Sequence, residues 1–271
     1  KPLFATVLVL FVAACATSPT GRKQLMLVSE ETAISSSRQA YAQEMGRYQK
    51  EGKLVTDPRA LKRVNVITER LVAQAVKMRP DSAKWQWSVQ VIDDPKTVNA
   101  WCMAGGRMAL YTGLIMKVDP TDDELAQVMG HEIAHALANH TAERMSTAMA
   151  ANAGILAAGI LSDNPGQAMA MTAAAATVAI KLPNSRTAEN EADQIGIELA
   201  ARAGYDPRAA VTLWQKMAKV GGSSPPEFLS THPSDATRQQ RLSALAPKML
   251  PYYQAGGARP TYPVRMGPAG V

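Results

Sequence analysis

The sequence predicts a mostly helical α+β domain with one small sheet. Helical periodicity occupies most of the chain, whereas the alternation typical of strands is confined to one short region. Apolar residues make up 46% of the 271 residues, which is ordinary for a folded domain and excludes overall disorder and collagen-like repetition. Aromatic residues are scarce (4 Trp, 7 Tyr, 3 Phe), so we expect a core built mainly from Ala, Leu, Val and Met.

The charge balance is basic but identifies no partner by itself. The formal net charge is +6. A basic surface can favour anionic lipids or nucleic acids, yet no dense block of Lys and Arg accompanies this charge. We therefore predict no nucleic-acid partner.

The first 14 residues predict a secretory signal that is not part of the fold. Lys1 precedes an apolar run over residues 3–14, which is too short to span a bilayer because spanning takes about 20 residues. Residues 12–15 (Val-Ala-Ala-Cys) resemble a bacterial lipobox, in which Cys15 becomes the lipidated N-terminus. The alternative is an ordinary signal with an incidental cysteine. Because the first residue is not Met, we expect the chain to start inside the signal.

Lipidation at Cys15 would anchor the chain in a membrane. Ala16, rather than Asp, follows the cysteine, which favours the periplasmic side of the outer membrane in Gram-negative bacteria. The other cysteine, Cys102, would then have no partner in the chain, so we predict no disulfide framework. Two cysteines cannot build a cysteine-rich zinc site, so any metal must be held by His and carboxylate groups.

Two long helices and a short sheet are predicted in the first half of the chain. Residues 15–28 predict a tether, and Ser29 predicts the N-cap of a helix over residues 30–51. A second helix is expected over residues 58–78. Residues 85–91 alternate between apolar and polar side chains, which is typical of a half-buried strand.

Two further strands and the start of a long helix are predicted over residues 98–124. Extended segments are expected at residues 98–103 and 107–111, separated by a turn at Gly105-Gly106. Thr121, with Glu124 three residues later, predicts a capping box at the start of a long helix.

The end of the chain predicts a loosely attached tail. Residues 248–271 are rich in Pro and Gly and are expected to lie outside the folded domain. The sequence therefore predicts one domain over residues 29–247.

The chemistry of the sequence centres on residues 131–135, His-Glu-Ile-Ala-His, inside the capped helix. Residues four positions apart lie on one face of a helix, so His131 and His135 can bind one ion while Glu132 lies beside it. Zinc suits this pattern because it is tetrahedral and a catalytic site keeps one position for water. We predict one Zn²⁺ per chain.

A third metal ligand is predicted on the segment 185–193. Glu189 and Asp193 share a helix face, whereas Glu191 points about 200° away from Glu189. We predict Glu189 as the third ligand and Asp193 as a carboxylate that orients a ligating histidine. Glu191 is expected to lie at an exposed acidic helix start, which the helix dipole favours.

The two motifs together are specific enough to indicate a family. His-Glu-x-x-His followed by Ser-Arg-x-x-Glu-x-x-Ala-Asp resembles the zinc metallopeptidases typified by the CAAX prenyl endopeptidase, HtpX and BepA. Residues 99–106 and 111–114 are similar to the strand-and-turn segment of that family, although Ala104 stands where Pro is expected. Residues 20–25 resemble the start of its short lipoprotein members. The resemblance covers residues 20–245.

The resemblance implies a zincin-like metalloprotease fold and a mechanism. A zinc-bound water would attack the scissile carbonyl, and Glu132 would act as general base. The resemblance also implies that substrate pairs with an edge strand near residues 105–110, with Gly105, Gly106 and Arg107 as candidate substrate-binding residues. Such pairing would favour unfolded or misassembled polypeptides as substrates.

Three further residues near the predicted site remain to be assigned. His232 resembles the histidine of the family's mobile His-Pro loop; it could silence the zinc, stabilise the oxyanion as a catalytic residue, or simply serve the turn. Arg238, one helical turn on, is a candidate to hold the substrate carbonyl or the loop. His140 lies nine positions after His131, on the opposite side of the same predicted helix, and is expected to be structural.

The segment 145–182, rich in Ala and Met, predicts a helical lid over the zinc cleft; a membrane-touching lid is the alternative.

The sequence leaves three functions to compare. The main prediction is a lipid-anchored zinc endopeptidase that degrades misfolded or misassembled envelope proteins. The alternatives are a membrane-integrated processing protease and a chaperone-like factor with a silent zinc site that works with the outer-membrane assembly machinery.

Overall fold

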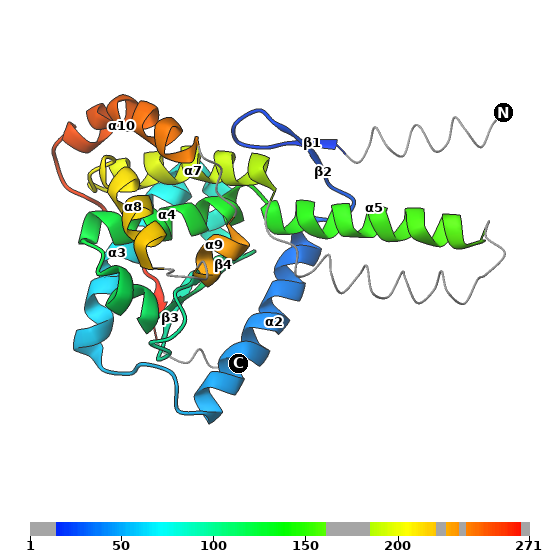
Figure 1. Cartoon of the computed structure of the whole chain (residues 1–271), viewed down its shortest axis with the longest axis horizontal. Helices are drawn as coiled ribbons and strands as arrows, with labels where there is room; N and C mark the ends of the chain where they lie inside the picture. Colours follow the sequence, from blue (N-terminus) through cyan, green and yellow to red (C-terminus); the bar gives the residue numbers. More distant parts are fainter. Residues whose placement is uncertain (1–14, 161–184, 221–225, 233–236, 267–271) are drawn as a thin grey trace.

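The structure is a computed structural model that describes residues 15–160, 185–220, 226–232 and 237–266. Helices and a small sheet form the body of the molecule, and helix α5 (His140–Ile160) projects from that body as an arm (Figure 1). The predicted signal over residues 1–14 lies outside the described residues, as does the second half of the predicted lid.

The first two helices begin where the sequence predicts them. In α2 (Glu30–Lys50) the Ser29 side chain accepts a hydrogen bond from the main-chain N–H of Thr32. In α3 (Pro58–Met78) Asp57 is the N-cap and Pro58 opens the first turn, where its missing N–H is not needed. The later helices are α4 (Asp122–Leu137), α7 (Arg186–Arg202), α8 (Ala209–Val220), α9 (Glu227–Thr231) and α10 (Arg238–Gln254).

The main sheet has four strands in the order β4-β5-β3-β6. The central strands β3 (Ser88–Ile92) and β5 (Arg107–Tyr111) are parallel, and β4 (Ala100–Met103) pairs antiparallel with β5. Gly105 and Gly106 form the predicted turn between β4 and β5, with φ angles of +83° and +81°. A side chain at Gly106 would also collide with the Trp87 ring, 2.5 Å away.

The order of the strands corrects the predicted site of substrate pairing. The prediction placed that pairing along residues 105–110, but β5 is hydrogen-bonded to β4 on one side and to β3 on the other. The strand at this edge of the sheet is β4. Neighbouring strands in a sequence do not reveal which of them lies at the border, because that depends on contacts with distant segments.

The sheet lies between α2 on one face and α3 and α4 on the other. Successive side chains of a strand point to opposite faces, so each strand contributes to two clusters. On the α2 side, Tyr41, Met45 and Tyr48 pack with Ile92 and Tyr111. On the opposite side, β3 and β5 contribute Val89, Val91, Met108 and Leu110 to the main core. That core consists largely of Ala, Leu, Val, Ile and Met.

Two segments predicted to lie outside the domain are part of the fold. Residues 15–28, the predicted tether, contain an antiparallel hairpin of β1 (Cys15–Thr17) and β2 (Lys23–Leu25). At the other end, α10 runs through Pro247 and Pro251 to Gln254, and β6 (Arg265–Met266) pairs with β3. Composition reports only local flexibility. Main-chain pairing with β3 holds β6 in place, and side-chain hydrogen bonds from Arg22 to Glu143 and from Gln24 to the Ala138 carbonyl hold the hairpin.

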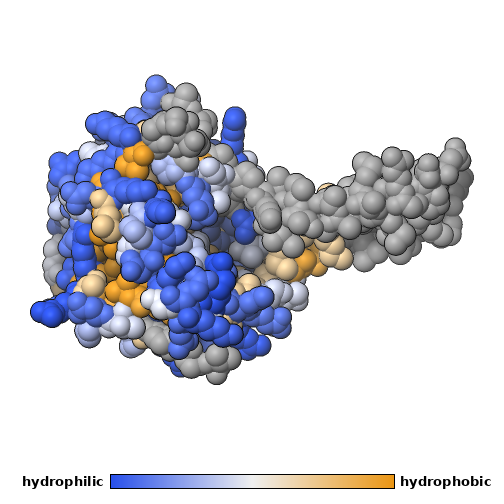
Figure 2. Space-filling model, turned by 60° about the horizontal axis from the view of Figure 1, so that its bottom comes forward, coloured by the Kyte–Doolittle hydropathy of each residue, from blue (hydrophilic) through white to orange (hydrophobic). Residues whose placement is uncertain are grey.

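No helix in the described part of the chain is long and apolar enough to cross a membrane. In the view of Figure 2, the body carries mainly hydrophilic residues with a narrow apolar strip, and apolar residues also show at the base of the arm. Met149 on α5 is 56% exposed.

The close crossing of α4 and α7 positions the site. Gly130 on α4 faces Gly196 on α7, and a side chain on Gly196 would lie 2.8 Å from the main-chain nitrogen of His131. No residue larger than glycine fits there without separating the helices. The two glycines therefore let the two motif-bearing helices approach backbone to backbone.

Candidate metal centre

Helix α4 is a fixed support for the His-Glu-x-x-His motif. Its start has the predicted capping box: Glu124 N–H donates to Thr121 Oγ1 at 3.2 Å, and Thr121 N–H donates to Glu124 Oε2 at 2.9 Å. The same carboxylate pairs with Lys216 of α8 at 2.6 Å. His131, Glu132 and His135 lie on this buried helix.

Four side chains from three segments converge on one point. The Nε2 atoms of His131 and His135 are 3.1 Å apart. Glu189 of α7 places Oε2 3.2 Å from His131 Nε2 and Oε1 3.3 Å from His135 Nε2. His232, which follows α9, places Nδ1 3.3 Å from His131 Nε2 and 3.1 Å from Glu189 Oε1. All four residues are buried, and the group could hold a metal ion.

The spacing of these atoms fits a tetrahedral ion. A tetrahedron with metal–ligand bonds of about 2.0–2.1 Å separates its ligand atoms by about 3.3 Å. Five contacts between these side chains, which involve both oxygens of Glu189, are 3.1–3.3 Å long, and one ligand atom from each of the four residues lies within 4.8 Å of the others. Two imidazoles and a carboxylate are also the donor types that a catalytic metal of this class uses.

The charges in contact at this point also favour a cation. Burial opposes a charged ring at His131, but Glu189 and Asp193 outweigh it and raise the pKa of His131 to about 9. Burial alone would raise the pKa of Glu189, yet the neighbouring histidines hold that pKa far below its ordinary value. Burial lowers the pKa of His135 well below its ordinary value. The centre therefore combines a permanent carboxylate with a neutral imidazole.

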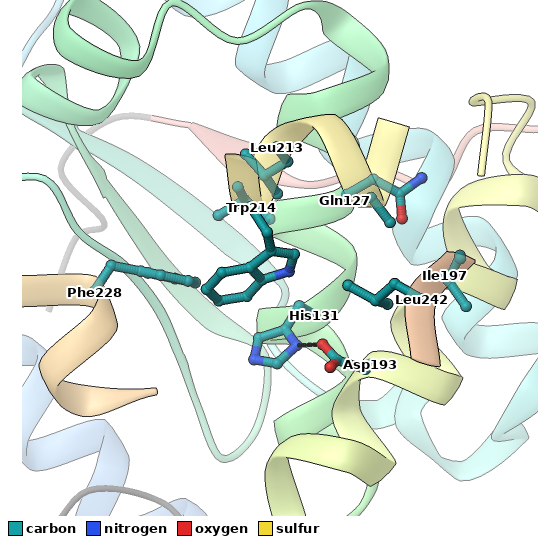
Figure 3. Close-up of a pocket in the computed structure, with 10 residues that line it drawn as sticks. Gln127, His131, Asp193, Ile197, Leu213, Trp214, Phe228 and Leu242 are labelled. Carbon is teal, nitrogen blue, oxygen red and sulfur yellow. Dashed lines mark ion pairs between the residues drawn. The ribbon is translucent and has the colours of Figure 1, made fainter. Parts of the chain in front are cut away.

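Asp193 takes the place that the sequence predicts. Its Oδ1 lies 3.1 Å from Nδ1 of His131, so it can fix the orientation of that ring while Nε2 faces the cluster (Figure 3). Glu189 and Asp193 share one face of α7, as their spacing indicates.

Arg238 does not fit the predicted role in substrate binding. Its side chain is 1% exposed and donates to Asp193 Oδ1 at 2.6 Å and to Glu189 Oε2 at 3.3 Å. The guanidinium also stacks on the Trp214 ring, 3.5 Å from its centroid. Arg238 thus neutralises the two carboxylates from inside the protein. The sequence placed it near the loop but could not show that it turns inward.

A cavity of about 20 Å³ lies beside His131 and Asp193 (Figure 3). Its walls are mainly apolar and include Trp214, Phe228 and Leu242. This volume holds about one water molecule and no substrate side chain. The cavity therefore belongs to the core behind His131 and is not a substrate channel.

Glu132 lies where α4 meets β4. Its carboxylate accepts a hydrogen bond from the main chain of Cys102, and burial raises the pKa of Glu132. Its Oε1 lies 3.3 Å from Nε2 of His232, although it forms no hydrogen bond with any described residue. A buried carboxylate with a raised pKa and a free oxygen is suited to accept a proton.

The open edge of β4 runs past Glu132. Asn99 and Tyr111 form a hydrogen-bonded pair, with the Tyr111 N–H donating to the Asn99 carbonyl at 3.1 Å. Hydrogen-bonded pairs alternate along an antiparallel ladder, so the main-chain groups of Ala100 and Cys102 point away from β5. The N–H groups of these two residues donate to Asn99 Oδ1, at 2.9 Å, and to Glu132. An extended chain beside Glu132 could therefore pair with this edge through the carbonyls of Ala100 and Cys102.

The three candidate substrate-binding residues near the turn do not lie at an open edge of the sheet. Gly105 and Gly106 form the turn itself. Arg107 is buried and donates to the side chain of Gln86. All three belong to the turn or to β5, and β5 has no open edge.

His140 and Glu191 lie near the metal cluster, where the sequence did not place them. Helix α4 ends at Leu137, Asn139 adopts a φ of +55°, and α5 begins at His140. This break turns His140 back, so its Nδ1 lies 2.7 Å from Nδ1 of His135. Glu191 is only 4% exposed and lies 3.1 Å from His140. Asn139 was the available signal, because asparagine tolerates the left-handed conformation that ends a helix.

A buried His-Glu-x-x-His helix crossed by a second helix that bears a glutamate, in a mostly helical zincin-like α+β domain, defines a metallopeptidase. Residues 58–246 match the model of Peptidase family M48. The chain belongs to peptidase family M48.

Three relatives show the range of the similarity. The mitochondrial metalloendopeptidase OMA1 of Arabidopsis thaliana is 38% identical over 159 residues, which cover 58% of this chain and 31% of the relative. The mitochondrial metalloendopeptidase OMA1 of Bos taurus is 32% identical over 245 residues, 85% of this chain and 46% of the relative. The beta-barrel assembly-enhancing protease of Yersinia pestis is 31% identical over 209 residues, which cover 73% of this chain and 41% of the relative. The chain spans less than half the length of these relatives.

Proposed function

We propose that the chain is a zinc-dependent endopeptidase whose metal is held by His131, His135 and Glu189, with Glu132 as general base. The spacing of 3.1–3.3 Å between the ligand atoms carries this proposal. Zinc in such a site would lower the pKa of a bound water and polarise the scissile carbonyl. Once His232 has moved away from Oε1, Glu132 would take up the proton on this atom and pass it to the leaving amine.

His232 would control access to this machinery. Its Nδ1 contacts the metal cluster while its Nε2 contacts Glu132, so one imidazole covers both the fourth ligand position and the general base. The ring stacks on Phe228, with 4.4 Å between the centroids. Displacing His232 would free Glu132, and the displaced imidazole could then donate a hydrogen bond to the oxyanion.

The substrate would be an extended polypeptide that pairs with the edge of β4. Main-chain pairing needs an unfolded segment, because a folded surface does not present a free strand. The support is the edge of β4 beside Glu132, where the carbonyls of Ala100 and Cys102 point away from β5. The Yersinia pestis relative is named for β-barrel assembly, which supports unfolded or misassembled envelope proteins as substrates and a link to outer-membrane assembly.

The location is proposed from the sequence. Residues 12–15 resemble a lipobox, so we propose a lipid anchor on Cys15 at the periplasmic side of the outer membrane. Mass spectrometry of the membrane fraction would detect acylation at Cys15. A Cys15→Ser variant that fractionates with the membrane as the wild type does would contradict the anchor.

Casein hydrolysis tests the endopeptidase. The wild-type chain, Glu132→Gln and His232→Ala are compared after zinc has been measured in each. We expect Glu132→Gln to retain zinc and lose activity by at least about a hundredfold, and His232→Ala to gain activity. An active Glu132→Gln variant would refute the role of Glu132.

The position of His232 favours one competing function. If the ligand position stays covered, the protein would act as a chaperone-like assembly factor with a silent site. Wild-type and His232→Ala chains that both hold zinc and both fail to cleave casein would favour this second function.

A further inference from the structure

A continuous series of polar contacts leads from the metal cluster to the N-terminal hairpin. His135 presents Nε2 to Glu189, and its Nδ1 lies 2.7 Å from Nδ1 of His140. His140 Nε2 lies 3.1 Å from Oε2 of Glu191. Arg22, in the hairpin, donates through Nε to the same Oε2 at 2.8 Å. His135 and His140 are five positions apart, whereas the two links through Glu191 join residues 51 and 169 positions apart.

Glu191 is the point where these contacts converge. Beyond His140 and Arg22, it accepts hydrogen bonds from the hydroxyls of Ser18 and Thr20. A buried carboxylate is costly unless donors satisfy it, and the hairpin supplies three of the four side chains that do so. The segment around Ser18, Thr20 and Arg22 has no part in the hydrolysis proposed above, so its contacts call for another role.

The hairpin is also held close to the end of α4. Gln24 donates to the carbonyl of Ala138 at 2.8 Å, directly after the helix that carries His135. Glu143 of α5 accepts two hydrogen bonds from Arg22, both at 2.6 Å. These contacts fix Arg22 in place against Glu191.

One proton arrangement satisfies the series with neutral rings. A lone pair on Nε2 of His135, directed at the cluster, puts the proton on Nδ1, which donates to Nδ1 of His140. His140 then carries its proton on Nε2 and donates it to Glu191. A hydrogen bond of this kind fixes the tautomer and ring plane of a metal ligand and makes its other nitrogen more basic.

We propose that His140, Glu191 and Arg22 are positioning residues that hold His135 in the tautomer and orientation that bind the metal. The N-terminal hairpin would thereby be a working part of the metal centre. The inference rests on the proposed function of the His131, His135 and Glu189 cluster. Asp193 and Arg238, which are buried in the core, support His131 in the equivalent way: Asp193 contacts its Nδ1, and Arg238 contacts Asp193.

Metal affinity tests this proposal independently of proteolysis. Metal-free full-length chains are titrated with zinc against a chelator, and thermal unfolding of each metal-free chain is recorded. We expect Glu191→Gln to weaken zinc affinity by about 10–100-fold. The control is Glu198→Gln on the same helix, which removes the carboxylate partner of Arg202 and lies outside this series of contacts. Its zinc affinity should stay within about twofold of the wild type, well below that loss.

A second pair of variants separates positioning from folding. His140→Asn keeps an acceptor that can receive the His135 proton, whereas His140→Leu removes it. We expect zinc affinity to be largely retained in His140→Asn and lost in His140→Leu. Cobalt-loaded His140→Leu should also show an altered visible absorption, because the ring of His135 is no longer held.

Unchanged zinc affinity in both Glu191→Gln and His140→Leu would overturn the proposal, even if both metal-free chains melt at lower temperature. If Glu191→Gln does not fold, Arg22→Met provides the same comparison and should weaken affinity by a smaller factor. Wild-type and His232→Ala chains that both bind zinc tightly and both cleave no casein would refute the endopeptidase, while the affinities would still decide the role of the hairpin.

Discussion

Replacing Gly196 by alanine would test whether the close crossing of α4 and α7 builds the metal centre. The new methyl group would lie 2.8 Å from the nitrogen of His131, 2.9 Å from its Cα and 3.0 Å from the carbonyl carbon of Gly130. All three are backbone atoms, so no side-chain rotation can relieve the contacts. The helices would have to move apart by about 0.5–1 Å to restore ordinary contact distances of about 3.5 Å or more.

The cost of this separation can be estimated. Overpacking costs about 1–3 kcal/mol, and backbone contacts place Gly196→Ala near the upper end. The higher helix propensity of alanine offsets about 1 kcal/mol. The net loss of about 2 kcal/mol should lower the melting temperature by about 4–8 °C. The separation of His131 from Glu189 would grow by a similar fraction of an ångström, so metal binding should weaken as well.

A matched glycine on α2 provides the control. No atom lies within 4 Å of a methyl group built on Gly46. Gly46→Ala should therefore be neutral or stabilise the protein by up to about 1 kcal/mol. Thermal unfolding and zinc titration of both variants decide the matter. If Gly196→Ala is as stable as Gly46→Ala and binds zinc as tightly, close helix packing does not set the geometry of the site.

Three other predictions concern the core, the edge strand and pH. Arg238→Met should destabilise the metal-free protein by about 3–5 kcal/mol in urea unfolding, because it leaves Asp193 and Glu189 buried without their cation; an unchanged midpoint would contradict this. If a substrate peptide is N-methylated at one position at a time, its cleavage rate should fall about tenfold when the methyl group is at alternate residues. This factor equals about 1.4 kcal/mol per lost main-chain hydrogen bond. A uniform response along the peptide would argue against pairing with β4. Burial would raise the pKa of Glu124, but Lys216 and other donors outweigh burial and lower that pKa. The ion pair therefore stabilises the fold above the unfolded pKa of about 4.3, and this stabilisation is lost as pH falls through the folded pKa. The difference in stability between wild type and Glu124→Gln should therefore shrink below about pH 4.3, and a constant difference would refute the assignment.

Local patterns in the sequence predicted the element that carries the chemistry. Thr121 and Glu124 marked the start of α4, and the spacing of His131 and His135 placed both imidazoles on one face. The spacing of Glu189 and Asp193 likewise placed both carboxylates on one face of α7. Helix starts, periodicity and turns depend on residues only a few positions apart, so a single sequence is enough to predict them.

The tertiary structure decided the features that join distant segments. Arg22 meets Glu191 across 169 positions of the chain, and Arg238 meets Asp193 across 45. The strand at the edge of the sheet, the return of His140 toward His135 and the inward turn of Arg238 all follow from packing. Each depends on how several elements share the space around α4. Local patterns carry no information about such contacts, because burial and hydrogen bonding between segments arise only when the whole domain packs.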